Sequence, residues 1–388
     1  MELDLMWILV GLPLAFGLGW LASRLDLRQL RIDNRQAPRA YFKGLNYLLN
    51  EQQDQAIDAF IEAVQNDPDT SELHFALGNL FRRRGEYERA VRVHEHLMQR
   101  GDLSLADRQR AQHGLALDFL KAGLLDRAED ALRKLEGTSF EGQARLARLA
   151  IYERSREWPQ ASEVAQQLEN SGEANFAVRQ AHYLCEQARE CQAQSDAAGA
   201  QKLLLQALKT APQASRARIL LGQLQLSLGQ ATQALQTLNP LFETNALAAP
   251  LAAATLARAA KDAKDAHPIQ ATLILLQTHY ALAPCLDVME AMVTLEAASP
   301  DTVAASRSRY IDHLNQHPSL IAASRWLAGE TLAHENFHPP IQAALELAAK
   351  PLARYRCAAC GFEAKEHFWH CPGCQAWDSY PPRRVEEL

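Results

Sequence analysis

The sequence predicts an all-α protein in which a solenoid of helical pairs follows one membrane-spanning helix and ends in a small metal-binding module. Three observations predict this. Small residues recur about every 34 positions through much of the chain, an uncharged stretch lies near the N-terminus, and two C-x2-C pairs lie near the C-terminus. The 388 residues are rich in Ala, Leu and Gln and include only 12 Phe, 9 Tyr and 6 Trp, a composition that favours helices.

The charge balance argues against nucleic acid as a partner. The formal net charge is -6 and the sequence pI is near 6.1, whereas phosphate binding needs a surplus of Lys and Arg on some face. Outside the C-terminal pairs the cysteines are Cys185, Cys191 and Cys285, which lie irregularly within helical patterns. We interpret them as buried reduced thiols, which implies a reducing compartment.

The stretch from Leu5 to Ser23 contains no charged residue and predicts a transmembrane helix. Nineteen helical residues span about 28 Å, close to the hydrocarbon thickness of a bilayer. A cleaved signal peptide is the alternative, but such peptides begin with a basic segment, whereas Glu2 and Asp4 precede this stretch.

A basic segment follows the predicted span and sets its orientation. Its arginines are Arg24, Arg28, Arg31, Arg35 and Arg39. Because Lys and Arg beside a membrane helix stay on the cytoplasmic side, we expect a single pass through the membrane, an outward-facing N-terminus and a cytoplasmic remainder. The first four recur at helical spacing, so they either meet lipid headgroups along one helix face or act as a topology signal only.

Three small residues lie four positions apart within the predicted span: Gly11, Ala15 and Gly19. Small residues on one face let a second helix approach closely, so this stripe predicts a packing seam for a partner helix or for a second copy of the chain. The alternative is that Gly and Ala are simply common in membrane helices and that Pro13 bends this one.

The middle of the chain repeats with the period of tetratricopeptide units. Gly44 and Gly78 are 34 residues apart, and so are Ala56 and Ala90. The alanine continues at steps of 38, 33, 39 and 34 as Ala128, Ala161, Ala200 and Ala234. A small residue is needed there because the two helices of a unit cross at that point. We therefore predict six units between about Arg39 and Leu241, followed by helical pairs in which the pattern decays.

A solenoid of this kind presents a long concave surface to another protein or peptide, so binding is its default function. One part of that surface is locally basic on an acidic protein: Arg82, Arg83, Arg84, Arg89 and Arg92. These residues predict a dock for an acidic segment near the membrane. The alternative is a solvated helix and turn.

One enzyme-like pattern occurs. His334, Glu335 and His338 match the H-E-x-x-H motif of zinc proteases, in which both histidines lie on one continuing helix. Pro339 and Pro340 follow at once, and a residue before proline is driven away from helical geometry. We interpret the match as coincidence, find no phosphate-binding or nucleophile motif elsewhere, and expect no catalytic residue and no enzymatic activity.

Four cysteines near the C-terminus predict a metal site: Cys357, Cys360, Cys371 and Cys374. Two C-x2-C pairs ten residues apart close a tetrahedral four-cysteine site for one iron or zinc ion, and four sulfurs leave no open position for substrate or water. Such a site is structural or transfers electrons. The surrounding aromatic residues are Tyr355, Phe368, Trp369, Trp377 and Tyr380, and we expect them to form most of a core too small to fold without the metal.

The cysteine motifs CAACGF and WHCPGC resemble a shortened pair of rubredoxin knuckles. With one membrane helix and a repeat array, and with the stretches LGNLFRRRGE and HFWHCPGCQAW, the whole chain resembles the lipopolysaccharide assembly protein B family. That resemblance implies an inner-membrane adaptor that helps a membrane AAA+ protease degrade the deacetylase committing precursors to lipid A. It also implies a lipopolysaccharide-sensing membrane protein that restrains the adaptor.

The sequence leaves two other functions open. A rubredoxin-like redox partner on a repeat scaffold is one, although Gln375 stands where free rubredoxins commonly have Gly, which argues against an electron carrier. A general lipopolysaccharide assembly scaffold without a role in proteolysis is the other. The expected divisions are 1–23 transmembrane helix, 24–38 basic juxtamembrane segment, 39–245 tetratricopeptide repeats, 246–350 degenerate helical repeats and 351–388 rubredoxin-like metal-binding domain.

Overall fold

The computed structural model describes residues 15–17, 20, 42–66, 70–172, 174–263, 266–297, 300–330 and 335–388. Within these ranges no helix is both long enough and apolar enough to cross a bilayer. The predicted membrane span falls outside the described residues except at positions 15–17 and 20. Gly11, Gly19 and the arginines of the basic segment also lie outside them, so the predicted seam and orientation stay predictions.

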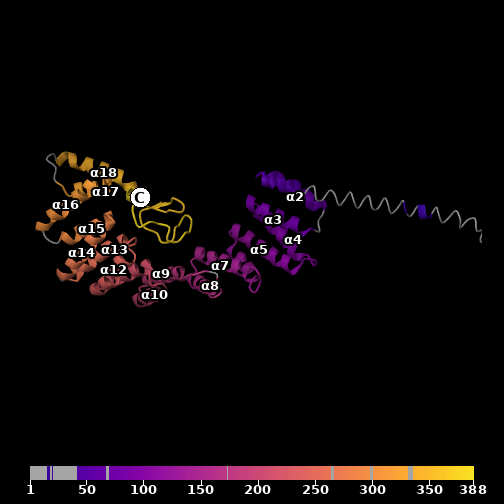
Figure 1. Cartoon of the computed structure of the whole chain (residues 1–388), viewed down its shortest axis with the longest axis horizontal. Helices are drawn as coiled ribbons and strands as arrows, with labels where there is room; N and C mark the ends of the chain where they lie inside the picture. Colours follow the sequence, from indigo (N-terminus) through magenta and orange to yellow (C-terminus); the bar gives the residue numbers. More distant parts are fainter. Residues whose placement is uncertain are drawn as a thin grey trace, which may run out of the picture. The chain divides into compact units, whose positions relative to one another are not determined.

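The prediction of an all-α repeat fold is confirmed (Figure 1). The chain divides into two compact units, Met1–Ile151 and Tyr152–Leu388. Helices of the first unit are α2 (Gln53–Asn66), α3 (Ser71–Arg84), α4 (Tyr87–Gln99), α5 (Leu105–Lys121) and α6 (Leu125–Arg133), and α7 (Glu141–Ser155) runs across the division. The second unit continues with α8 (Trp158–Asn170), α9 (Ala177–Ala193), α10 (Ala197–Thr210), α11 (Ser215–Ser227), α12 (Ala231–Thr244), α13 (Pro250–Asp262), α14 (Ala266–Leu282), α15 (Leu286–Glu296), α16 (Pro300–Gln316), α17 (Leu320–Ala328) and α18 (His338–Leu352).

The recurring alanine marks the second helix of each pair. One such alanine lies in each of α2, α4, α6, α8, α10 and α12, and all are fully buried at 0% exposure: Ala56, Ala90, Ala128, Ala161, Ala200 and Ala234. A larger side chain has no space at these positions, because close-packed helices leave few voids. The repeat period therefore reflects the closest approach of two helices.

The recurring glycine serves the same contact from the first helix. A Cβ at Gly78 would lie 2.6 Å from the His94 ring, and a Cβ at Gly222 would lie 2.6 Å from Cγ of Leu238. In both pairs the partner stands four residues after the recurring alanine, one helical turn along the second helix. The missing Cβ of the glycine on the first helix thus leaves space for the large side chain, His94 or Leu238, that the second helix places one turn after its alanine.

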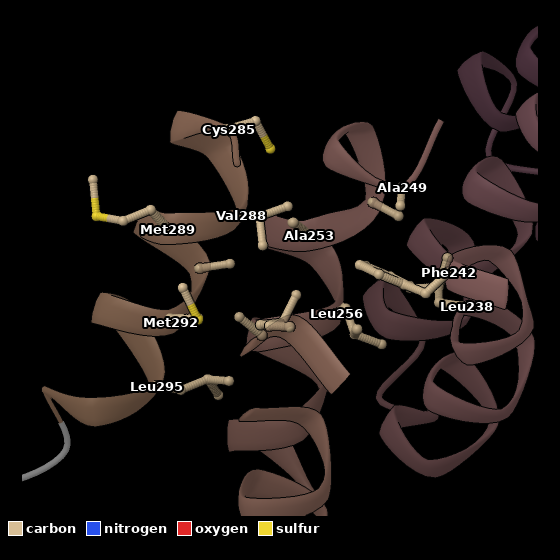
Figure 2. Close-up of a cluster of buried hydrophobic side chains, with 14 of the residues drawn as sticks. Leu238, Phe242, Ala249, Ala253, Leu256, Cys285, Val288, Met289, Met292 and Leu295 are labelled. Atoms are coloured by element: carbon tan, nitrogen blue, oxygen red, sulfur yellow. The ribbon is translucent and has the colours of Figure 1, made fainter. Parts of the chain in front are cut away.

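A large hydrophobic cluster of the second unit joins α12, α13 and α15 (Figure 2). Phe242 of α12 meets the alanine-rich face of α13, and Val288 and Met292 of α15 pack on the other side of that helix. Cys285 also lies here, and burial raises the pKa of its thiol to about 12, so it remains protonated and inert. The region in which the sequence pattern decays therefore keeps the same helix-on-helix packing.

A small module with little regular structure follows α18. Strand β1 (Tyr355–Arg356) pairs antiparallel with β2 (Glu363–Ala364), and an isolated bridge joins His370 to Trp377. A short 3-10 helix, η2 (Val385–Glu387), closes the described chain. In Figure 1 the module, drawn in yellow, lies on the inner side of the curve that the helices of the second unit form, and side-chain contacts to α7, α9, α15 and α17 hold it there.

Candidate metal centre and its support

The four predicted cysteine ligands converge on one point. Their Sγ atoms all lie within 4.8 Å of one another. The Sγ atoms of Cys357 and Cys374 are 3.8 Å apart, and those of Cys360 and Cys371 are 3.7 Å apart. A tetrahedral ion with metal–sulfur bonds of about 2.3 Å requires sulfur–sulfur separations of about 3.8 Å. The thiolates therefore fit one zinc or iron ion, which confirms the predicted cofactor site.

Each C-x2-C pair ends in the same tight turn. The N–H of Gly361 donates to the carbonyl of Cys357, and the N–H of Gln375 donates to the carbonyl of Cys371, both at 2.9 Å. Both turn residues adopt left-handed backbone, with φ of 77° at Gly361 and 60° at Gln375. Only glycine adopts this conformation without a steric cost, so Gln375 stores about 1 kcal/mol of local strain. The deviation noted in the sequence thus keeps the knuckle geometry.

The local electrostatics prepare the site for a cation. Burial disfavours the thiolate of Cys357, but its hydrogen bond with the Ser379 hydroxyl and those from the N–H groups of Cys360 and Ala359 lower its pKa to about 6. The N–H of Phe362 favours the Cys360 thiolate, yet desolvation and the neighbouring cysteine sulfurs raise its pKa to about 12. The low pKa of Cys357 favours a thiolate there, and cation binding favours deprotonation of the other ligands.

The ligand set limits the chemistry of the centre. When bound, zinc would hold the two knuckles together, and iron would add one-electron transfer. Four protein sulfurs complete the tetrahedron, so the residues present leave no coordination position for a substrate. Cys357 and Cys371 are buried, whereas Cys360 and Cys374 are exposed at the protein surface.

A stack of rings fastens the module to the repeats. The indole of Trp377 lies between the imidazoles of His182 and His370, with ring centroids at 4.7 and 4.3 Å. Its edge meets the rings of Trp158 and Tyr183 at 6.2 and 6.0 Å. Aromatic pairs of this geometry stabilise a contact by about 0.5–1.5 kcal/mol beyond the burial of area. Trp377 was expected in the core of the module, but it lies outside the module's buried cluster and forms the joint with α8 and α9 instead.

A buried carboxylate completes this joint. The Trp377 indole N–H donates to Oε1 of Glu153 at 3.1 Å, and the Tyr183 hydroxyl donates to the same oxygen at 2.5 Å. His182 Nε2 lies 2.9 Å from Oδ2 of Asp378 in the module. Burial, followed by the Glu153 charge, raises the pKa of Tyr183, so its hydroxyl stays a donor at physiological pH. No sequence pattern indicates this contact, since Glu153 and Trp377 are 224 positions apart.

The segment after the module seals two helix N-termini. Glu387 accepts the N–H of Leu286, at the start of α15, at 2.7 Å. Glu386 accepts the N–H of Leu320, at the start of α17, at 2.5 Å and the hydroxyl of Ser319 at 2.6 Å. These groups lack partners within their own helices, and negative charge is favourable at a helix N-terminus. The one hint in the sequence is that α15 starts after Cys285, a poor capping residue.

An ion pair joins the same segment to α15. Arg384 donates to Oδ1 of Asp287 at 2.7 Å and to the carbonyl of Ala353 at 2.9 Å. The Tyr355 hydroxyl reaches Oδ2 of Asp287 at 3.3 Å. Asp287 thus links the first strand of the module and the terminal segment to one helix.

The predicted basic patch is partly neutralised within the first unit. Arg82 pairs with the buried Asp118 at 2.7 Å, and Asp118 also lies 2.5 Å from Nδ1 of His94. Further ion pairs join Arg84 to Asp54 and Glu86, Arg89 to Glu86, and Arg92 to Glu88. Arg83 and Arg92 are exposed. Arg82 therefore has a structural role, and docking of an acidic segment at this patch stays a prediction.

The H-E-x-x-H match lies partly outside the described residues, because His334 is not among them. His338 Nε2 lies 2.9 Å from the Leu327 carbonyl. The expectation that the prolines would exclude His338 from a helix was wrong, since α18 begins at His338 and Pro339 and Pro340 occupy its first turn. Proline suits that position because the first N–H groups of a helix need no intrahelical partner.

Fold and site together define a tetratricopeptide-repeat protein with a rubredoxin-type four-cysteine domain. Residues 355–381 match the rubredoxin metal binding domain, and residues 43–93 and 192–259 match tetratricopeptide repeats. Lipopolysaccharide assembly protein B of Escherichia coli K12 is 32% identical, with 98% of each chain covered. Its namesake of Haemophilus influenzae is 26% identical, with 99% of each chain covered. The chain belongs to the lipopolysaccharide assembly protein B family.

A solved structure, Naa15/Naa10 bound to HypK-THB, is a distant neighbour. It covers 82% of this chain and 48% of its own, with a TM-score of 0.42 at 13% identity.

Proposed function

We propose that the protein is an inner-membrane adaptor that regulates lipopolysaccharide synthesis. It promotes degradation of the lipid A-committing deacetylase by a membrane AAA+ protease, and a lipopolysaccharide-sensing membrane protein restrains it. The name of the curated relatives, lipopolysaccharide assembly protein B, supports the link to lipopolysaccharide. The protease, the deacetylase and the sensor come from the family resemblance.

The observation that carries the adaptor proposal is the closed four-cysteine centre seated on helical repeats. Four cysteine sulfurs meet within 4.8 Å, and Trp377 fixes their module to α8 and α9. A metal without an open coordination position supports a structural role rather than hydrolysis. Repeats with a folded module on their inner side present surfaces for partner proteins, which supports a scaffold over an enzyme.

Topology is the first test of the proposal. If the arginines after residue 23 set the orientation, a reporter fused after Leu388 is active only in the cytoplasm. Alkaline phosphatase and green fluorescent protein fusions read the two sides independently. Phosphatase activity of this fusion in the periplasm would overturn the proposed localisation.

Tethering to the membrane is the second test. An adaptor that shares a membrane with its protease gains effective concentration, so deletion of residues 1–23 leaves a folded protein with much weaker regulation. We expect the deacetylase half-life, measured after a translation block at native expression of the adaptor, to lengthen at least several-fold. Replacement of residues 1–23 by an unrelated membrane helix is the control: recovery shows that tethering suffices, and failure shows that the native span makes specific contacts, for which Gly11, Ala15 and Gly19 are the candidates. A normal half-life in the untethered variant would contradict the adaptor mechanism.

A general assembly scaffold is the second candidate, favoured by the name of the relatives. Crosslinking from membranes followed by identification of partners separates the two: recovery of the protease and the deacetylase supports the adaptor, and recovery of assembly proteins alone supports the scaffold.

A redox partner is the third candidate. Reversible visible absorption of the purified protein would support it, and a colourless zinc form with full activity would exclude it.

A further inference from the structure

The metal module and the repeats enclose a groove of about 660 Å³. Arg156, Trp158, Arg189 and Arg216 line it from the repeats, and Phe368 and Trp369 line it from the module. The volume lies in the range of ligand-binding clefts, about 300–1,000 Å³. The groove therefore holds a short segment of chain and not a folded domain.

Arg216 is the buried arginine of this groove and has an incomplete set of partners. Its side chain is 3% exposed, and Nη2 donates to Oε1 of Glu186 at 2.6 Å. Nε and Nη1 are buried and have no hydrogen-bond partner among the described residues. Arg216 also lines a second cavity, of about 370 Å³. Because Nε and Nη1 are both buried, a ligand in the groove meets the positive charge of Arg216 at short range, whereas N–H donors come from the exposed arginines of the lining.

The charge of the groove favours an anionic ligand. Three arginines line it, against the carboxylates of Glu186 and Glu366. Glu186 is engaged by Arg216 and lies 3.8 Å from Arg189, which remains 61% exposed at the rim. A single carboxylate fits this small positive excess.

The walls favour a peptide over a headgroup or a free anion. Trp158 and Trp369 are mostly buried, and the Phe368 ring is 36% exposed, so an apolar side chain next to the carboxylate would find an aromatic surface. We infer that the groove binds an extended peptide segment of a partner protein in which an acidic residue stands beside an apolar one. The acidic side chain is held by the exposed arginines Arg156 and Arg189 and is attracted by the charge of the buried Arg216, and the apolar one packs on the aromatic wall.

This inference goes beyond the proposed function, because it holds for any partner with such a segment. It also gives the metal a role in recognition, since Phe368 and Trp369 belong to the module that the metal folds. The basic patch of the first unit is a separate surface.

The test uses the full chain, metal-loaded and in detergent, and a displayed library of random nine-residue peptides. We expect enriched peptides to carry Asp or Glu beside an aliphatic or aromatic residue. The best peptide is synthesised with a label, and its affinity is expected to fall when the acidic residue is replaced by Asn or Gln. R189E and R156E change exposed side chains, and F368A removes a partly exposed ring that also contacts Tyr380, so metal content is checked for F368A. Each variant is expected to weaken binding about tenfold or more. R154E, an exposed arginine outside the groove lining, is the matched control and keeps full affinity.

R216Q tests whether the buried charge of Arg216 contributes to binding. It is interpreted only if its thermal unfolding matches that of the parent. Enrichment without acidic residues, or equal affinity in R189E and R154E, would overturn the inference. Displacement of the peptide by millimolar inorganic phosphate or by phosphatidylglycerol vesicles would assign the groove to phosphate chemistry and overturn it as well. Neither outcome depends on whether the deacetylase is a partner, so the adaptor proposal stands or falls separately.

Discussion

Replacing Cys371 and Cys374 together by serine is expected to release the metal ion and to unfold residues 355–380. The module buries only a small core, with Tyr355, Cys357, Cys371 and Tyr380 at its centre. A segment of this size cannot bury enough apolar surface to offset the entropy of ordering its chain. Structural zinc in small domains contributes about 10–16 kcal/mol of apparent binding free energy at neutral pH, which is folding free energy for such a module.

The repeats are expected to survive this change. Solenoid stability is roughly a sum of neighbour terms, so helical content by far-UV circular dichroism falls little while the melting temperature drops modestly. The ring stack of Trp377 on α8 and α9 is lost, which shifts tryptophan fluorescence to the red and opens residues 355–380 to proteolysis. Metal content per chain falls from one to none.

Cys191→Ser is the matched control, since Cys191 is half-buried and lies outside the metal centre. It is expected to keep the metal and the proteolytic protection. In cells, the double variant is expected to let the deacetylase accumulate as loss of the whole protein would. Loss of the metal with a protected module, or with a normal deacetylase level, would show that the centre is dispensable.

The second large effect is expected at the terminal segment. Replacing Glu386 and Glu387 together by alanine removes the acceptors from the first turns of α17 and α15. Loss of a capping side chain costs about 0.5–2 kcal/mol, and loss of a favourable charge at a helix N-terminus costs about 0.3–1 kcal/mol. The two sites together are expected to lower the free energy of unfolding of the second unit by about 2–4 kcal/mol.

Differential scanning calorimetry resolves this change. For a unit of this size, each 1 kcal/mol shifts the melting temperature by about 2–4 °C. Glutamine at both positions keeps the acceptor oxygens but loses the charge, so it is expected to lie between the parent and the alanine variant. Glu190→Ala, on the exposed side of α9, controls for the removal of one acid. An unchanged melting temperature in the alanine variant would show that water replaces both carboxylates without loss.

The repeated elements could be predicted from the sequence because their physics is local or periodic. Ala56 and Ala90 recur at one spacing since each sits at the same helix crossing, and the burial of both agrees with that spacing. The cysteine pairs are equally local, because the knuckle turns are built within a few residues. His338 shows where such a local rule fails: proline disfavours a helical predecessor, yet α18 begins at His338 because the first turn tolerates the prolines that follow.

The parts that could not be predicted join positions far apart in the chain. Nothing near Glu153 indicates that its carboxylate is buried under Trp377, and nothing near Leu286 indicates that Glu387 covers its N–H. Each of these contacts depends on the path of the whole second unit. The unpaired N–H groups of Arg216 are likewise visible only once Glu186 and the module are in place.

The capping of α15 by Glu387 also orders events in time during synthesis. The two residues of this contact are 101 positions apart, so at about 5–20 residues per second the ribosome adds Glu387 about 5–20 s after Leu286. Helices form within microseconds, so α15 emerges and packs long before its cap exists. During that interval the first N–H groups of α15 are hydrated. The terminal segment that later joins the metal module to this helix has not yet been made. The nascent chain must therefore build its repeats as a stable surface first, and metal uptake and sealing come last.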